Sequence, residues 1–255
     1  MTEAAAEGRV GRPRSTGDSR RWMGQGTEIF LGVLAGTSDA RLDEPTDLPG
    51  WTGKHLVAHV AANADALGNL VRWARTGEPT PMYSSPEQRV ADIEAGATRD
   101  AASLREWVRS SAAALTADLH GLPEERWSRQ VRTAQGRTVP ATEIPWMRAR
   151  EIMVHAVDLS AVADDGRMSF ADLPADFLVA LVTDVVGKRG SAPEPGPGLV
   201  VAPRGADLRW SVPGVGDPQT VTGTLADLTA YLTGRAGGPV TTLAGKPAPN
   251  LPPWL

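Results

Sequence analysis

Residues 146–159 read WMRAREIMVHAVDL and place Glu151 and His155 one turn apart in a helical pattern. On a helix, residues i and i+4 have their Cβ atoms about 6 Å apart on one face, so a glutamate and a histidine can reach a common ion. A third ligand from a facing helix would complete a set of two histidines and one glutamate. Such a set leaves one position open for water or substrate, as catalytic zinc sites do. The stretch therefore favours a bundle helix that supplies two ligands of a divalent metal.

His59 is the candidate for the third ligand. It belongs to a predicted helix over 53–75, where it shares one broad stripe with the apolar positions Leu56, Val60, Ala64, Leu67 and Val71. An imidazole on that stripe faces the bundle interior, where burial without a partner would be costly. His55, one turn earlier on nearly the same face, is the rival. Lone helical histidines are often exposed or satisfied locally, and Glu–xxx–His pairs arise by chance, so spacing alone leaves the metal interpretation open.

Other polar residues on the same two segments have two interpretations each. Asn63 lies one turn beyond the candidate histidine and either lines the same cavity or is exposed. Asp158 is either a hydrogen-bond partner that orients His155 or a charge at the helix end. Arg148 and Arg150 either bind an anion near the site or lie on a solvated face.

The rest of the chain predicts an α+β fold in two parts. We expect a mobile tail over residues 1–20, a four-helix metal-binding domain over 21–165 and a smaller α+β domain over 166–255. The four helical segments are expected at 22–34, 53–75, 85–119 and 146–159, with turns at 47–51, 77–86 and 122–139 and an extended region around Pro145. In the second domain we expect helices at 171–186 and 224–233 and strands at 198–202, 208–212, 220–223 and 240–243.

Composition narrows the classes of partner. The 26 basic and 30 acidic side chains give a net charge of −4 without a long block of either sign, so we expect no nucleic-acid partner. No apolar stretch approaches the roughly 18 residues of a membrane span, and the N-terminus lacks the apolar region of a secretory signal. We therefore expect a cytoplasmic protein with no membrane partner. We also expect a monomer, although the sequence does not define the oligomeric state. The chain has no cysteine, so any thiol chemistry must use a thiol from outside.

Several motifs together resemble the mycothiol-dependent maleylpyruvate isomerase family. They extend over residues 22–255 and comprise LPGWT at 48–52, HLVAH at 55–59, NADAL at 63–67, WARTG at 73–77, IPWMRARE at 144–151, VHAVDL at 154–159 and LPPWL at 251–255. The resemblance implies a DinB-like four-helix N-terminal domain and a smaller α+β C-terminal domain. It also implies a zinc ion held by His59, Glu151 and His155, whereas His55 falls where the family often has a histidine that is not a ligand.

The resemblance further implies mycothiol as thiol cosubstrate and, for some members, conversion of maleylpyruvate to fumarylpyruvate. Arg89 and Arg235 fit the family's arginines for substrate carboxylates, and Asn63 and Arg148 are our candidates for contact with mycothiol. If Arg235 reaches the site, the second domain closes over the first. A mycothiol S-transferase and a non-catalytic metal- or ligand-binding module remain alternatives. Nickel, cobalt or iron could replace zinc on the same donors, and the sequence does not define the physiological substrate.

Overall fold

The structure is a computed structural model that describes residues 12–254. The described chain divides into two compact units, one of residues 15–168 and one of residues 12–14 together with 169–254. The division lies three residues after the predicted boundary at 165.

The predicted tail over residues 1–20 is wrong at its C-terminal end. Helix α1 (Thr16–Ala35) already begins at Thr16, because Ser15 and Asp18 form a capping box in which the Ser15 side chain accepts a hydrogen bond from the Asp18 backbone N–H. Residues 1–11 of the predicted tail lie outside the described residues.

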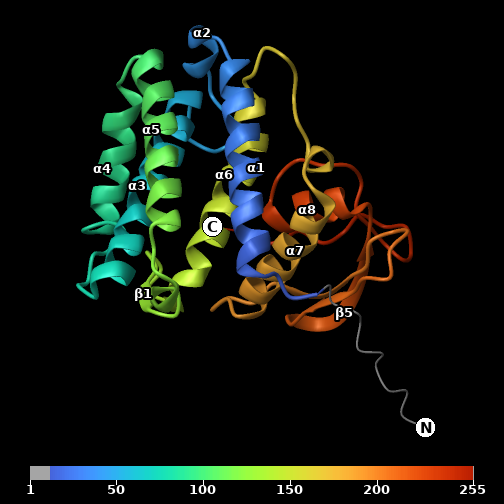
Figure 1. Ribbon diagram of the computed structural model, residues 1–255. Helices are drawn as coiled ribbons and strands as arrows, with labels where there is room; N and C mark the ends of the chain where they lie inside the picture. The colour runs from blue at the N-terminus through green and yellow to red at the C-terminus, as the bar shows by residue number, and fades with distance from the viewer. Residues whose placement is uncertain (1–11, 255) are drawn as a thin grey trace. The chain divides into compact units, whose positions relative to one another are not determined.

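The helical unit is built on four long helices, as Figure 1 shows: α1, α3 (Gly53–Thr76), α5 (Ala101–His120) and α6 (Ile144–Ser160). Helix α1 packs on α6, and α3 packs on both α5 and α6. The shorter helices are α2 (Asp39–Leu42) and α4 (Pro86–Ala97), of which α4 lies against α3. The core is apolar and includes Phe30, Leu56, Leu104 and Ile152, each with no exposed surface. The predicted four-helix bundle is therefore confirmed.

Three local expectations for this unit are wrong. The segment predicted as one helix over 85–119 is two helices, since Asp100 caps α5 by accepting a hydrogen bond from the Ser103 backbone N–H at 2.8 Å. The predicted turn at 122–139 contains a short antiparallel hairpin, β1 (Gln130–Arg132) with β2 (Thr138–Pro140). Pro145 lies in the first turn of α6 rather than in an extended region, a position where the missing N–H has no helical acceptor to lose.

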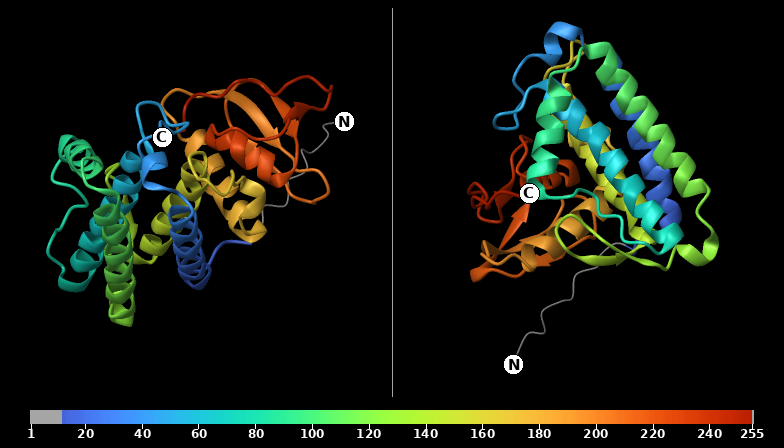
Figure 2. Two further views of the ribbon diagram at one scale, coloured as in Figure 1. Left: turned by 90° about the horizontal axis from the view of Figure 1, so that it is seen from above. Right: turned by 90° about the vertical axis from the view of Figure 1, so that its left-hand side faces the viewer.

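The C-terminal unit consists of a four-stranded sheet and two helices. The strand order is β4 (Trp210–Val212), β3 (Pro197–Val201), β5 (Val215–Thr222) and β6 (Thr241–Thr242); β3 and β5 are parallel and the other pairs antiparallel. Helix α7 (Ala175–Gly190) packs on β4 and on α8 (Leu225–Thr233). Figure 2 shows these helices beside the sheet. The predicted α+β class is confirmed, although α7 begins four residues later than expected, after Pro174, and a 3-10 turn occupies Phe170–Asp172.

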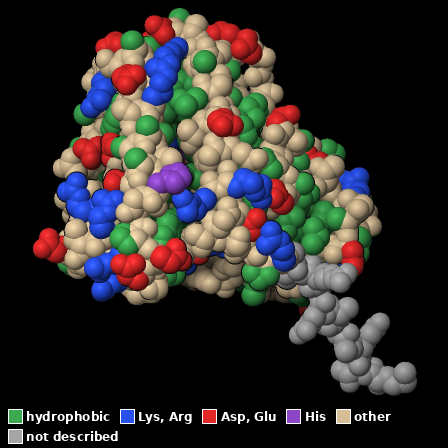
Figure 3. Space-filling model, in the orientation of Figure 1, with side chains coloured by type: hydrophobic (Ala, Val, Ile, Leu, Met, Phe, Trp, Pro, Cys, Tyr) green, Lys and Arg blue, Asp and Glu red, His purple; other side chains and the backbone are tan. Residues whose placement is uncertain are grey.

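Basic and acidic side chains lie interspersed on the face shown in Figure 3. Among the described helices, none combines the length and the apolar character that crossing a membrane requires.

Candidate metal centre

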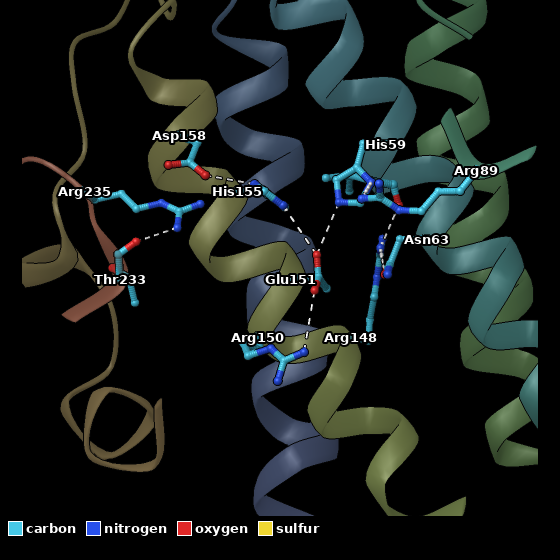
Figure 4. A network of polar contacts seen from close by, with 11 residues as sticks. His59, Asn63, Arg89, Arg148, Arg150, Glu151, His155, Asp158, Thr233 and Arg235 are labelled. Atoms are coloured by element: carbon cyan, nitrogen blue, oxygen red, sulfur yellow. Dashed lines mark hydrogen bonds and ion pairs between the residues drawn. The ribbon is translucent and has the colours of Figure 1, made fainter. Parts of the chain in front are cut away.

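The helical unit brings together one residue of α3 and two of α6. His59, Glu151 and His155 each offer a ligand atom, and these atoms lie within 4.8 Å of one another. Figure 4 shows both histidines directed at the same carboxylate. Oε2 of Glu151 is 3.3 Å from Nε2 of His59 and 3.4 Å from Nε2 of His155. Three candidate ligands from two packed helices therefore converge on one point; the helical spacing predicted only that Glu151 and His155 share a face.

Asp158 orients His155. Its Oδ2 is 2.9 Å from Nδ1 of His155, and the carboxylate is buried with only 5% of its surface exposed. Since a carboxylate accepts, Nδ1 carries a proton. When the ring is neutral, its lone pair is therefore on Nε2, the nitrogen that faces Glu151 and could bind a metal. A carboxylate behind a metal-binding histidine fixes its tautomer in this way. The structure thus decides between the two interpretations of Asp158 in favour of a partner for His155.

His59 has different neighbours. The ring of Trp51 lies 5.2 Å from its own ring, centroid to centroid, and Nη2 of Arg89 on α4 is 3.4 Å from its Nδ1. A guanidinium only donates hydrogen bonds, so in this arrangement Nδ1 of His59 accepts and Nε2–H donates to Glu151. Binding a metal through Nε2 requires the opposite tautomer. The contact between Arg89 and His59 is therefore incompatible with a metal ligated through Nε2.

His55 is engaged elsewhere. Its Nδ1 accepts a hydrogen bond from the Thr52 backbone N–H at 3.2 Å, at the start of α3, and its Nε2 is 3.4 Å from Oε2 of Glu94. It is thus a capping residue with a surface partner. The geometry separates it from the candidate ligands, which are His59, Glu151 and His155 in the described part of the chain.

Burial and hydrogen bonding set the charges of the three candidate ligands. Burial would raise the pKa of Glu151, but the hydrogen bonds from His155 and His59 lower it well below its usual range. Burial lowers the pKa of His59 to about 4 despite its bond to Glu151. For His155, burial is outweighed by the hydrogen bonds to Asp158 and Glu151, so its pKa is raised. The site thus combines an ionised Glu151 and a neutral His59 with a His155 whose pKa is raised by its two carboxylate neighbours.

The two arginines of α6 are not on a solvated face. Arg148 has 1% of its surface exposed, and its Nη1 donates to the Val60 carbonyl oxygen at 2.7 Å and to Oδ1 of Asn63 at 3.0 Å. Burial lowers the pKa of Arg148 to about 10. Nη2 of Arg150 is 3.7 Å from Oε1 of Glu151. The candidates for mycothiol contact, Asn63 and Arg148, are thus bonded to each other in the protein interior.

Tyr83 is a neighbour of the site that the sequence did not indicate. Its phenol is hydrogen-bonded to Arg89, and burial raises its pKa. The residue lies in the loop between α3 and α4, over residues 77–85, where no periodicity predicts which side chains turn inward. The one available signal was that the chain contains only two tyrosines.

Arg235 follows the end of α8 in the C-terminal unit. Its Nη1 donates to the Thr233 carbonyl oxygen at 2.8 Å, and its guanidinium carbon lies 5.7 Å from the centre of the Trp254 ring. Those contacts hold the side chain against the C-terminal segment of its own unit.

The donor set fits a divalent metal. Two imidazole nitrogens and one carboxylate oxygen are the ligands of many catalytic zinc sites, and Asp158 supplies the hydrogen bond behind one histidine that such sites have. Nickel, cobalt and iron accept similar donors. The chemistry of the residues therefore supports a metal centre without choosing the element.

Fold and site together define the class: a two-domain α+β protein whose helical bundle contains a candidate metal centre of two histidines and one glutamate. Residues 23–160 match the mycothiol maleylpyruvate isomerase N-terminal domain, and residues 172–253 match the C-terminal domain of the same family. The chain belongs to the mycothiol maleylpyruvate isomerase family.

Two solved structures agree with this assignment. The crystal structure of the mycothiol-dependent maleylpyruvate isomerase is 39% identical to this chain, covers 94% of this chain and 98% of its own, and has a TM-score of 0.87. A histidine-to-alanine mutant of that enzyme gives the same values. No curated protein sequence matches the chain.

Proposed function

We propose that this protein is a mycothiol-dependent isomerase that converts the cis double bond of maleylpyruvate or a similar enedioate into the trans form. The observation that carries the proposal is the convergence of His59, Glu151 and His155. It occurs in a chain that is 39% identical, over nearly its whole length, to a mycothiol-dependent maleylpyruvate isomerase. The absence of cysteine agrees with a thiol supplied by a cosubstrate.

The proposed metal is zinc, held by His59, Glu151 and His155. A free thiol has a pKa of about 8.5 and is only a few per cent thiolate at pH 7. A bound dication supplies the charge stabilisation that shifts this balance toward thiolate. The protein's part is to keep Glu151 ionised and to orient the His155 ring through its hydrogen bond to Asp158. The contact of Arg89 with Nδ1 of His59 must break before Nε2 of His59 binds a metal.

The reaction needs no net consumption of thiol. The thiolate sulfur adds to one carbon of the cis double bond, and the π electrons move into the conjugated carbonyl group. Rotation about the resulting single bond follows. The carbon–sulfur bond then breaks, the double bond forms again in the trans geometry, and the thiolate returns unchanged. In this proposal Arg89 and Arg235 bind the substrate carboxylates, since a guanidinium matches a carboxylate with two parallel hydrogen bonds.

Metal content and activity of a ligand variant test the proposal. His155→Ala removes one of the three donors, and we expect it to lose both bound zinc and thiol-dependent isomerase activity. His120→Ala is the matched control, because His120 is exposed at the end of α5 and its Nδ1 lies 2.8 Å from the Thr116 carbonyl oxygen of the same helix. Full activity in the His155 variant, or zinc loss in both variants, would contradict the assignment.

The amount of thiol consumed distinguishes an isomerase from a transferase. A mycothiol S-transferase uses one thiol for each product, whereas an isomerase returns it. A metal- or ligand-binding module without catalysis would have a filled coordination shell, turn over no thiol and leave maleylpyruvate unconverted. These outcomes separate the two alternatives from the isomerase.

A further inference from the structure

Arg148 connects the two helices that carry the candidate ligands. It lies on α6, and its Nη1 donates to the carbonyl oxygen of Val60 at 2.7 Å and to Oδ1 of Asn63 at 3.0 Å, both on α3. The side chain is buried, with 1% of its surface exposed. Figure 4 shows the guanidinium beside Asn63, between the two helices.

These bonds lie close to the metal centre along both helices. Val60 follows His59 directly, and Arg148 precedes Glu151 by three residues, which is one helical turn. The contact therefore fixes α3 against α6 at the level where their ligand atoms meet. A shift of either helix by about 1 Å would take the 3.3 Å separation between His59 Nε2 and Glu151 Oε2 out of hydrogen-bonding range.

A role in stability alone does not account for a charged residue at this position. Burying a guanidinium is costly, and apolar residues of similar volume often stabilise a protein as well or better. In addition, Nη2 of Arg148 is buried and has no hydrogen-bond partner among the described residues. The side chain provides something that a methionine would not, namely a nitrogen, Nη1, that donates to both a backbone carbonyl and a side-chain amide on the facing helix.

We propose that Arg148 is a positioning residue that sets the spacing of α3 and α6, so that His59 meets Glu151 and His155 in a geometry suited to a metal. The proposal rests on the metal centre of the proposed function. It differs from a purely electrostatic role, because a cation near the site repels a metal dication and its removal would then strengthen metal binding.

Metal affinity distinguishes the two roles. We compare wild type, Arg148→Met and Arg148→Lys by competition for Zn²⁺ with a chelator, and by the visible spectrum of the Co²⁺-loaded proteins. A positioning role predicts Zn²⁺ binding about 10–100-fold weaker in the Met variant, as for other partners outside the ligand shell, with an altered Co²⁺ spectrum. The Lys variant, which keeps the charge and one donor, should regain part of the affinity.

Arg105→Met is the control. Arg105 also joins two segments, since Nη2 donates to the Thr37 carbonyl oxygen and lies 3.1 Å from Oδ1 of Asp39, but its partners lie between α1 and α3. Its loss should leave the Zn²⁺ affinity within a factor of about two of wild type. Equal or tighter Zn²⁺ binding by Arg148→Met, or equal weakening in the control, would overturn the proposal.

A metal-free measurement keeps this inference separate from the proposed function. In a crystal structure of metal-free Arg148→Met we expect His59 Nε2 and Glu151 Oε2 to lie beyond 3.5 Å, outside hydrogen-bonding distance. An unchanged separation would refute the positioning role even if wild type binds zinc. Failure of wild type to bind any metal would refute the metal centre, while the separation would still decide whether Arg148 sets the helix spacing.

Discussion

At the scale of single residues, the three candidate ligands differ in the burial and the charged neighbours that set their pKa values. Glu151 is stabilised as an anion by two imidazoles, His59 is neutral because burial dominates, and His155 is held by two carboxylates. The i,i+4 spacing in the sequence was sufficient to predict that Glu151 and His155 share a face. It could not show that Arg89 contacts His59 or that Tyr83 bonds to Arg89, since those contacts depend on the loop before α4.

Asp158 should control the affinity for metal through His155. Asp158→Asn keeps the size of the side chain but removes the charge that holds Nδ1–H of His155, and we expect Zn²⁺ binding to weaken about 10–100-fold. Competition with a chelator measures this. Asp118→Asn is the control, because Asp118 pairs with Arg75 away from the three ligands. An unchanged Zn²⁺ affinity in Asp158→Asn would show that the carboxylate does not orient the ligand.

His59 should make the metal-free protein sensitive to acid. Its pKa is about 4 in the folded protein against 6.5 for the free side chain, so the unfolded chain binds the proton first as the pH falls. Stability is therefore lost between pH 6.5 and 4, by roughly 2–3 kcal/mol at pH 4.5. Urea unfolding at pH 6.5 and 4.5 should show a smaller loss for His59→Gln than for wild type. Equal losses would contradict a buried, neutral His59.

His155 should affect the pH dependence of stability in the opposite direction to His59. Its pKa is raised in the folded protein, so its contribution to stability is complete below the unfolded value of 6.5 and is lost as the pH rises through the raised folded value. The acid sensitivity below pH 6.5 therefore does not come from His155.

At the scale of elements, hydrophobic periodicity predicted α3 and α6 closely because both have a broad apolar stripe. It missed the break between α4 and α5, because the apolar spacing continues across Asp100, the residue whose side chain caps α5. It also missed the hairpin of β1 and β2, whose strands have three residues each. Short strands give too few alternating positions to recognise. Three strands of the C-terminal unit were predicted within about two residues, whereas β5 begins five residues before the predicted start at 220, and the order β4-β3-β5-β6 was not predicted.

The contact between α1 and α6 depends on Gly26. A Cβ at this position would lie 2.7 Å from Cγ2 of Ile152 and 2.8 Å from Cγ of Met153, the residues that follow Glu151. We expect Gly26→Val to cost about 1–3 kcal/mol of stability by overpacking and to weaken Zn²⁺ binding, since α6 must shift. Chemical denaturation and chelator competition measure the two effects.

Gly24 provides the control in the same helix. A Cβ there meets no atom within 4 Å, so Gly24→Ala should maintain or raise stability through its higher helix propensity. Equal stability of the Val variant and wild type would show that α1 and α6 are not closely packed at Gly26.

At the scale of the whole molecule, all three candidate ligands belong to the helical unit, whereas Arg235 belongs to the C-terminal unit. The sequence alone predicted this two-part organisation from the change from helical periodicity to short apolar runs with proline and glycine. Periodicity does not reveal which reaction the protein catalyses. The reaction was indicated only by the resemblance of the combined motifs to a known family.

Arg235 should affect catalysis and leave metal binding intact. If it binds a substrate carboxylate, Arg235→Met should lower kcat/KM for maleylpyruvate about 10²-fold, the scale of a lost positioning contact, with unchanged Zn²⁺ affinity. Arg209→Met, an exposed arginine of the same unit, is the control. Steady-state kinetics with both variants check this, and a kcat/KM equal to wild type would remove Arg235 from the reaction.

The central claim is that a metal held by His59, Glu151 and His155 lets an external thiol isomerise a cis double bond. The most direct measurement follows maleylpyruvate and free thiol together, using the zinc-loaded protein with and without mycothiol. We predict conversion to the trans product only when mycothiol is present, with the thiol concentration constant throughout. Conversion without mycothiol, consumption of one thiol per product, or no conversion while zinc remains bound would contradict the claim.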